Sequence, residues 1–429
     1  MFTKLAYLTF FIFVLLGCKQ ASSLLEKTIQ PKSHSYQKGI DLLYHCHFEK
    51  LAKLLNQNQN KLLKNSEQGL LSYYQNELKH SNKYFDVAIE VYRNNENKAL
   101  LDVSSFLSQE YEGEGYDKAF LHNYKAINYL ILGNAESARV EAKNSNIVQA
   151  ENRLKLNRLK DEEKNTKNQY LLSRYDKLFQ GVNPKHNPYQ NPFAYYVSAL
   201  GYAENKDFSN ALIDIKHAIT FAPNSKILQE KLKLYSDKKD TRSVEIFFDV
   251  GESPLKSQIN LEMELKNGEK RMVALPSFSL SKSNIDYIDI VDNKGVIIAR
   301  SSLLTDINAI KINEFKEKLP AILSILSREL VLSVGSEALG SQSTLLAGAF
   351  KAGMAIYTQV NISTWSLLPQ KILVASFPFS QNKRYKILAY SKNGTVLNES
   401  SLIISANNLT TNIYRHFFFR KNTMCKSEN

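Results

Sequence analysis

The residues most suited to chemistry form one short motif, Glu112-Gly113-Glu114-Gly115-Tyr116-Asp117-Lys118. Carboxylates separated by glycines could act as acid and base or hold a cation. They could equally be structural, because glycines permit a tight turn and acidic residues favour the start of the helix that follows. The structural interpretation is favoured over catalysis, and Glu112, Glu114, Tyr116 and Asp117 are also candidates for binding a partner.

Other patterns of known chemistry are weak in this sequence. His45-Cys46-His47 resembles a metal site, but adjacent residues of a helix point about 100° apart and cannot all face one ion. The sequence contains no glycine-rich phosphate loop, His-Glu-x-x-His helix, Gly-x-Ser-x-Gly elbow or Cys-x-x-Cys pair. We therefore expect no catalytic residue, no metal site and no cofactor.

The amino terminus has the pattern of a lipoprotein signal. Lys4 precedes an apolar run from Leu5 to Leu16, which is shorter than the ~20 residues of a permanent membrane span. Leu15-Leu16-Gly17-Cys18 then resembles the lipobox of bacterial lipoproteins, although Leu16 is bulkier than the usual residue there. An ordinary secretory signal followed by a chance cysteine is the alternative.

This resemblance implies that residues 1–17 are removed and that Cys18 is lipidated and holds the protein to a membrane. Residues 18–35 are then a lipid-anchored tether. The residue after Cys18 is Lys19, which under the sorting rule of enteric bacteria favours the outer membrane facing the periplasm. The predicted location is the bacterial cell envelope.

Composition adds modest constraints. The formal net charge of +13 permits an anionic partner, but lysines are spread along the whole chain, so we expect no nucleic acid as a partner. The apolar content of 43% is enough for packed cores. Besides Cys18 the chain has only Cys46 and Cys425, for which a disulfide is possible without being predicted.

Residues 36–240 are predicted to be helical, because Gly and Pro are sparse and apolar residues recur at spacings of three and four. The spacing within 195–223 is that of a tetratricopeptide repeat (TPR), in which small residues let helices approach closely. A less complete match spans 126–145, and a diverged one spans 70–94. The residues that carry the first match are Tyr195, Ala199, Tyr202, Ala211, Ile215, Ala218 and Pro223.

The equivalent alanines Ala138 and Ala211 are 73 residues apart, about twice the ~34-residue repeat. This indicates an insertion at 146–180, predicted as a charged helix from Glu151 to Tyr175 and followed by a proline-rich loop. The charges indicate a solvated helix, with a partner-binding arm as the alternative.

Residues 241–420 are predicted to be mainly β, with a helical insertion at 306–357 and a tail at 421–429. Alternating runs are separated by turn signals such as Asn293-Lys294-Gly295. The fold class is therefore α+β: an N-terminal TPR-like α-solenoid followed by a β-sandwich-like domain with an inserted helical hairpin. Phe417-Phe418-Phe419 is either a buried strand end, which we favour, or an exposed patch. The predicted strands are 244–250, 258–265, 271–275, 285–291, 296–300, 372–377, 384–390, 395–404 and 412–419.

Several segments together resemble an uncharacterised family of bacterial TPR-containing lipoproteins. They are the 111–118 motif, the helix with His122, Tyr124, Ala126, Asn128, Tyr129 and Leu130, the 195–223 repeat, the Lys318-Leu319-Pro320 helix start, and Trp365 with Leu368, Pro369, Ile372 and Ala375. The family usually has an acidic and basic pair before the tryptophan, whereas here Asn361 to Thr364 are uncharged. The resemblance implies architecture and envelope location, and it suggests cell-envelope assembly.

These features predict a membrane-anchored, non-catalytic scaffold that binds a protein partner through the concave surface of its repeats, with Trp365 as a further candidate contact. The alternative is an envelope enzyme, or a polysaccharide or lipid carrier that uses the β-rich half. A secreted factor that acts on a host is a third hypothesis.

Overall fold

The computed structural model describes residues 31–96, 111–163, 169–180, 182, 190–239, 242–264, 270–280, 283–320, 322–323, 360–380, 383–404 and 411–418. Cys18, the signal segment, the proline-rich loop, the second half of the helical insertion, Phe419 and Cys425 lie outside these residues. The described part is mixed α and β, as predicted, with several sheets.

Helices make up nearly all of the described residues before 240. Residues 307–320 form a further helix between the strands. The helices are α2 (Pro31–Tyr44), α3 (Phe48–Asn56), α4 (Lys61–Tyr74), α5 (Leu78–Glu96), α7 (Asp117–Ile131), α8 (Ala135–Glu163), α9 (Gln169–Leu178), α10 (Pro192–Glu204), α11 (Phe208–Phe221) and α12 (Lys226–Ser236).

Three helix hairpins, α4–α5, α7–α8 and α10–α11, are closed by the same turn. The second residue after each first helix has a positive φ, at Asn76 (66°), Gly133 (77°) and Lys206 (62°). The next amide donates to the carbonyl five residues earlier, as in Asn134 N to Tyr129 O at 2.8 Å. This capping satisfies carbonyls that a helix end would leave unpaired, and the same cap also ends α2 and α12.

Small residues let the hairpins pack closely. Ala138, Ala142, Ala199 and Ala211 are all fully buried. A Cβ on Gly201 of α10 would stand 3.3 Å from the backbone oxygen of Ala138 in α8. The predicted small positions are therefore where neighbouring helices touch.

The strands form two four-stranded sheets and one ribbon. One sheet has the order β10-β1-β7-β6, the other β5-β4-β8-β9, and β2 pairs with β3 alone. The strands are β1 (Ser243–Val250), β2 (Leu255–Glu264), β3 (Lys270–Ser279), β4 (Tyr287–Val291), β5 (Ile297–Arg300), β6 (Ser302–Asp306), β7 (Lys371–Pro378), β8 (Arg384–Tyr390), β9 (Val396–Ile403) and β10 (Thr411–Phe418).

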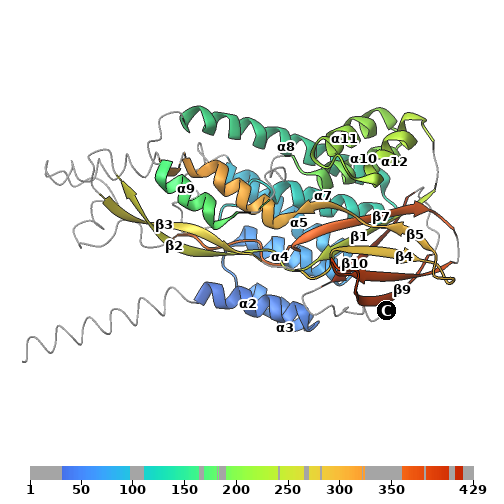
Figure 1. The fold of residues 1–429 in the computed structure, drawn as a ribbon, viewed down its shortest axis with the longest axis horizontal. Coiled ribbons are helices and arrows are strands. Elements are labelled where there is room, and N and C mark those ends of the chain that lie inside the picture. Colours follow the sequence, from blue (N-terminus) through green and yellow to red (C-terminus); the bar gives the residue numbers. More distant parts are fainter. Residues whose placement is uncertain are drawn as a thin grey trace, which may run out of the picture.

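Strand β1 is buried on both faces and lies between two layers (Figure 1). Ile246 and Phe248 belong to an apolar core shared with β4 and β8 of the other sheet. Phe247 points the opposite way, as alternation along a strand requires, and joins the core of the helical half. The sheet of β1 therefore has helices on one face and the second sheet on the other.

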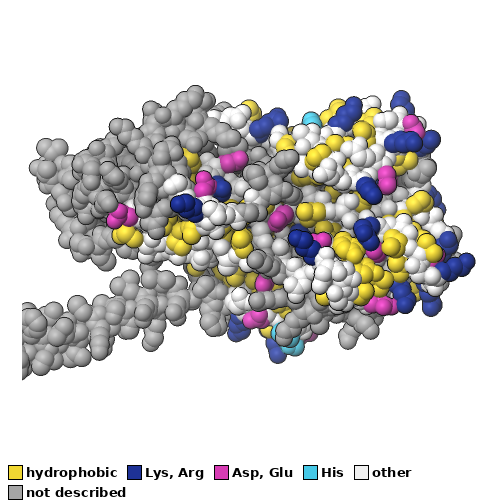
Figure 2. All heavy atoms as spheres, in the orientation of Figure 1, with side chains coloured by type: hydrophobic (Ala, Val, Ile, Leu, Met, Phe, Trp, Pro, Cys, Tyr) yellow, Lys and Arg dark blue, Asp and Glu magenta, His cyan; other side chains and the backbone are white. Residues whose placement is uncertain are grey.

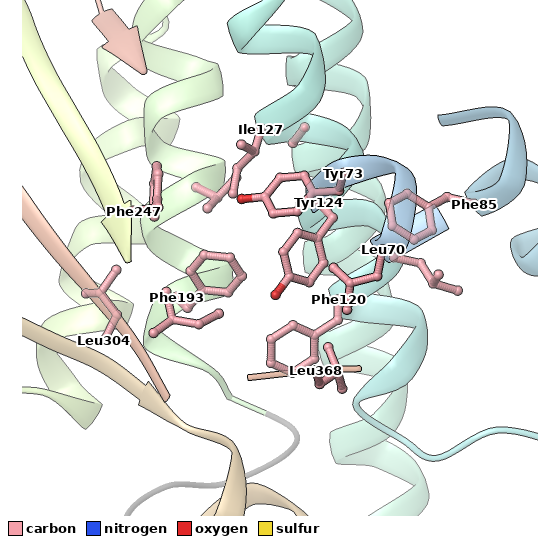
Figure 3. Packing of buried hydrophobic residues seen from close by; sticks show 14 of the residues in the cluster. Leu70, Tyr73, Phe85, Phe120, Tyr124, Ile127, Phe193, Phe247, Leu304 and Leu368 are labelled. Carbon is pink, nitrogen blue, oxygen red and sulfur yellow. The ribbon is translucent and has the colours of Figure 1, made fainter. Parts of the chain in front are cut away.

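The helices and this sheet share one continuous core. Tyr73 of α4, Tyr124 of α7 and Phe193 of α10 point into it beside Phe247 (Figure 3). The rings of Phe193 and Phe247 are 5.9 Å apart and edge-to-face, a favourable geometry. The inner surface of the helix hairpins is thus covered by the chain's own sheet.

The structure differs from the predictions at several strand ends, such as that of β3, which continues to Ser279 instead of ending at 275, and in four larger features. The charged segment after 151 continues α8, because no Gly or Pro interrupts 135–163, and α9 is a separate helix. Strand β6 was not predicted. Lys318-Leu319-Pro320 lies at the end of the described 307–320 helix instead of starting one. Helix α2 begins at Pro31, within the predicted tether.

Candidate functional site

The 111–118 motif and the Trp365 loop, which the sequence suggested separately, converge in one buried polar cluster. The cluster also includes α4, strand β2 and the 307–320 helix. Its charged members are Glu67, Glu114, Asp117, Lys256, Lys311, Glu314 and Lys318.

The motif forms a turn that opens α7. Asp117 lies in the first turn of the helix, and its Oδ2 accepts the Glu114 amide at 2.8 Å and the Tyr111 hydroxyl. Oε1 of Glu314 accepts the Gly115 amide at 2.6 Å. Carboxylates thus surround the positive end of α7, as the structural interpretation predicted.

Both glycines of the motif are required by geometry. Gly113 has a φ of +100°, and a Cβ there would stand 2.4 Å from the ring of Tyr92. A Cβ on Gly115 would stand 2.9 Å from the Glu314 carboxylate. The spacing of the motif follows from close packing around the turn.

Lys311 joins the motif to the tryptophan loop. Its ammonium donates to Thr364 Oγ1 at 2.9 Å and to the carbonyl of Trp365 at 3.0 Å, and it lies 5.9 Å from the centre of the Tyr116 ring. Lys311 is almost fully buried, and burial lowers its pKa.

Glu67 holds the other side of the same loop. Its Oε1 accepts the Ser366 amide at 2.6 Å and the Ser366 hydroxyl at 2.7 Å, and its Oε2 accepts the Leu367 amide at 3.0 Å. Burial nevertheless raises the pKa of Glu67 to about 7. An acidic group from α4 and a basic group from the 307–320 helix thus both bind the tryptophan loop.

The remaining charges of the cluster are paired across segments. Lys256 of β2 forms an ion pair with Glu114, and Lys318 contacts Glu314 at 2.6 Å. Burial, followed by the nearby charge of Glu114, raises the pKa of Asp117, and burial also raises that of Glu314. Such perturbed groups can mark active sites, but enclosed ion-pair networks perturb pKa values in the same way.

The burial of the candidate residues separates them into two groups. Tyr116 and Asp117 are each 2% exposed and Trp365 is fully buried, so a partner cannot reach these side chains in this conformation. Glu112 and Glu114 are partly exposed. Partner binding by these two remains a prediction, and Cys18 lies outside the described residues.

Sequence reasoning missed Glu67 and the three charged residues of the 307–320 helix. Lys311, Glu314 and Lys318 share one helical face by their spacing, and that repetition was a usable signal. Glu67 stands beside the polar residues Ser66 and Gln68 of α4, so its local sequence gave no sign that this carboxylate is buried. The sequence could not show that Glu67 bonds to Ser366, because Ser366 is about 300 residues away along the chain.

The His45-Cys46-His47 triplet does not present three ligands to one ion. Cys46 is disulfide-bonded, and His45 Nδ1 contacts the carbonyl of Asp41 at 2.7 Å. Among the described residues no cluster of His, Cys, Asp or Glu could hold a metal. Within the same residues, every helix is too short or too polar to cross a bilayer.

Comparison with known proteins gives no assignment for this site: no protein-family model and no curated protein sequence matches the chain.

One pair of variants distinguishes the effect of close packing at Gly113 from the effect of its positive φ. Gly113→Ala should lower the free energy of unfolding by ~2–4 kcal/mol, because a methyl group would meet Tyr92 in addition to the cost of a positive φ. Gly133→Ala is the matched control, because it has a positive φ with open space and should cost only ~1 kcal/mol. Denaturant unfolding checks both, and equal losses would contradict the packing role.

The raised pKa of Glu67 predicts a pH-dependent contribution to stability. The folded protein holds this proton up to a pH of about 7, whereas the unfolded chain releases it near 4.5. Stability from this group is therefore present below pH 4.5 and lost as the pH rises through 7. The advantage of wild type over Glu67→Gln should shrink by on the order of 3 kcal/mol between pH 4.5 and 8.

Chemical unfolding at several pH values measures this difference. Glu90→Gln, at an exposed position of α5, serves as the control and should differ from wild type by the same small amount throughout. A Glu67→Gln difference that stays constant with pH would refute the assignment.

Proposed function

We propose that this protein is a lipid-anchored, non-catalytic interaction scaffold of the bacterial cell envelope, possessing TPR-like repeats stabilised by a β-sandwich-like half. The three hairpins with identical turns and buried alanines support the repeat assignment. The two sheets that share an apolar core support the sandwich. The lipobox-like segment before Cys18 supports the membrane anchor and the outer-membrane location.

The binding surface in this proposal is the outside of the repeats. Helices α4, α7 and α10, which would line a concave groove, pack against the sheet of β1. Their inner surface has no room for a partner peptide. The second helices of the hairpins, α5, α8 and α11, carry the exposed side chains.

The observation that carries the proposal is an apolar stripe on α8. Val140, Ile147 and Leu154 recur every seven residues and are 47%, 45% and 58% exposed. Exposed Lys143 and Ala150 lie between them on the same helical face. α8 runs along the outside of the molecule (Figure 1).

A seven-residue repeat of apolar side chains is the pattern that packs against another α-helix. Arg139 and Glu151 flank the stripe, and Glu136, which pairs with Arg139, lies one turn before Val140, so both signs of charge border such a contact. We therefore take the partner to be a protein that supplies an amphipathic helix.

The disulfide of Cys46 supports a location outside the cytoplasm, where such bonds persist. If the sulfur of Cys18 carries the lipid, it cannot also form a disulfide. The proposal therefore implies that Cys46 pairs with Cys425.

The helix contact is tested by cross-linking in native membranes from a photoreactive residue placed at Lys143. We expect one discrete adduct, whose cross-linked peptide has an amphipathic helical pattern. Replacing Ile147 and Leu154 by Ser should abolish the adduct while changing stability by no more than ~0.5 kcal/mol each, because both are exposed.

Met272→Ser, at an equally exposed apolar residue of β3, is the control and should leave the adduct intact. A photoreactive residue at Lys216 of α11 should give no such adduct. An adduct that survives the double replacement on α8 would refute the proposed contact.

The anchor is tested by growth with labelled palmitate. Wild-type protein should carry the label and lack residues 1–17, whereas Cys18→Ala should lose the label and retain those residues. Cys425→Ala should remain labelled. Label that persists on Cys18→Ala would contradict lipidation at this residue.

A further inference from the structure

One end of the molecule gathers exposed basic side chains from several loops. The strand register brings these loops together, because Arg384 pairs with Ile403, Val291 with Lys386, and Ser243 with Pro378. Figure 2 shows Lys and Arg side chains along this end, at the right of the view. We call this surface the basic tip; its cationic members are Arg242, Lys294, Lys383 and Arg384.

The basic tip is presented by rigid backbone. In the turn between β4 and β5, Asp292 Oδ1 accepts the amides of Lys294 and Val296, both at 2.9 Å, and Gly295 has a φ of +81°. The Arg242 guanidinium stacks over the Phe379 ring at 4.6 Å, and the Arg242 carbonyl accepts the Phe379 amide. The backbone of the Lys294 turn and the side chain of Arg242 are therefore ordered before any partner arrives.

The acidic residues that the structure describes in these segments each have a partner. Asp292 caps its own turn, Glu399 pairs with Lys386 at 2.8 Å, and Asp237 pairs with Lys239 at 3.2 Å. Within the part of the chain that the structure describes, neither Lys294 nor Lys383 nor Arg384 forms an ion pair. Asp292 lies in the same turn as Lys294, but the tip carries more cations than carboxylates and is therefore a net positive surface.

Exposed apolar side chains accompany these charges. Val296 and Ile297 follow the Lys294 turn and are 55% and 52% exposed, and Ile403 beside Arg384 is 57% exposed. A soluble polyanion gains nothing from such side chains. An anionic bilayer offers phosphate groups to the cations and acyl chains to the protruding aliphatic groups.

We propose that the basic tip binds the surface of an anionic phospholipid membrane, with Lys294, Lys383 and Arg384 at the headgroups and Val296 and Ile297 inserted between them. Helix α2, which would follow the lipid tether, begins in the half of the molecule away from the basic tip (Figure 1). The tip is thus a second membrane contact, distinct from the anchor.

The test uses residues 19–429, purified without lipid, so that its outcome does not depend on Cys18. The protein is sedimented with vesicles of phosphatidylcholine alone or with ~30% phosphatidylglycerol, a strongly negative surface. We expect binding to the anionic vesicles only. Replacing Lys294, Lys383 and Arg384 together by Gln should weaken that binding at least ~10-fold, since each charge near the surface contributes roughly fivefold.

Replacing Lys79, Lys83 and Lys216 by Gln removes the same charge from exposed positions elsewhere and should leave most of the binding. Val296→Ser with Ile297→Ser should weaken binding several-fold without any change of charge. Equal binding to neutral vesicles, or equal losses in the two triple variants, would overturn the proposal. If polyphosphate competes fully and the Ser replacements have no effect, a soluble phosphate polymer is the ligand and the membrane assignment is wrong.

Discussion

The packing of three helices against one face of a single β-sheet organises this molecule. Tyr73, Tyr124 and Phe193 come from three successive hairpins, and Phe247 meets them from β1. Fully burying such a side chain contributes ~1.5–3 kcal/mol, and these contacts hold together halves that each have an open apolar face. Because the chain's own sheet covers the inner surface of the helix hairpins, their outer surface and the loops at the sheet ends are left exposed.

The buried polar cluster gives this packing its orientation. Apolar contact alone tolerates sliding, whereas the bonds of Glu67 to Ser366 and of Lys311 to Thr364 fix one arrangement of α4, the 307–320 helix and the tryptophan loop. These bonds place ionisable groups in low-dielectric surroundings. Burial there raises carboxyl pKa values, as it does for Glu67. The chemistry of the 111–118 motif is best understood as this positional role.

Local sequence signals predicted most of the elements, because alternation and turn residues act over short distances. Strand β8 was predicted at its observed bounds, and the Asn293-Lys294-Gly295 turn lies where expected. Strand β6 was not predicted because it is short and runs directly into a helix. The full length of α8 was not predicted, because the charged composition after residue 151 was interpreted as the start of a new helix.

The site was only half predictable for a related reason. The motif and Trp365 stood out as unusual residues, but their meeting depends on Lys311 and Glu67, whose partners are distant in sequence. The sequence also did not predict that the sheet covers the inner face of the helix hairpins, since periodicity identifies a helix without saying what lies against it.

The fluorescence of Trp365 can report on this arrangement. Trp365 is the only tryptophan of the chain and lies wholly inside the junction, near the rings of Phe85 and Tyr124. Its indole is shielded from water only while α4, α7 and the tryptophan loop stay together. Intrinsic emission therefore follows the docking of the two halves, and no engineered dye is needed to watch them separate.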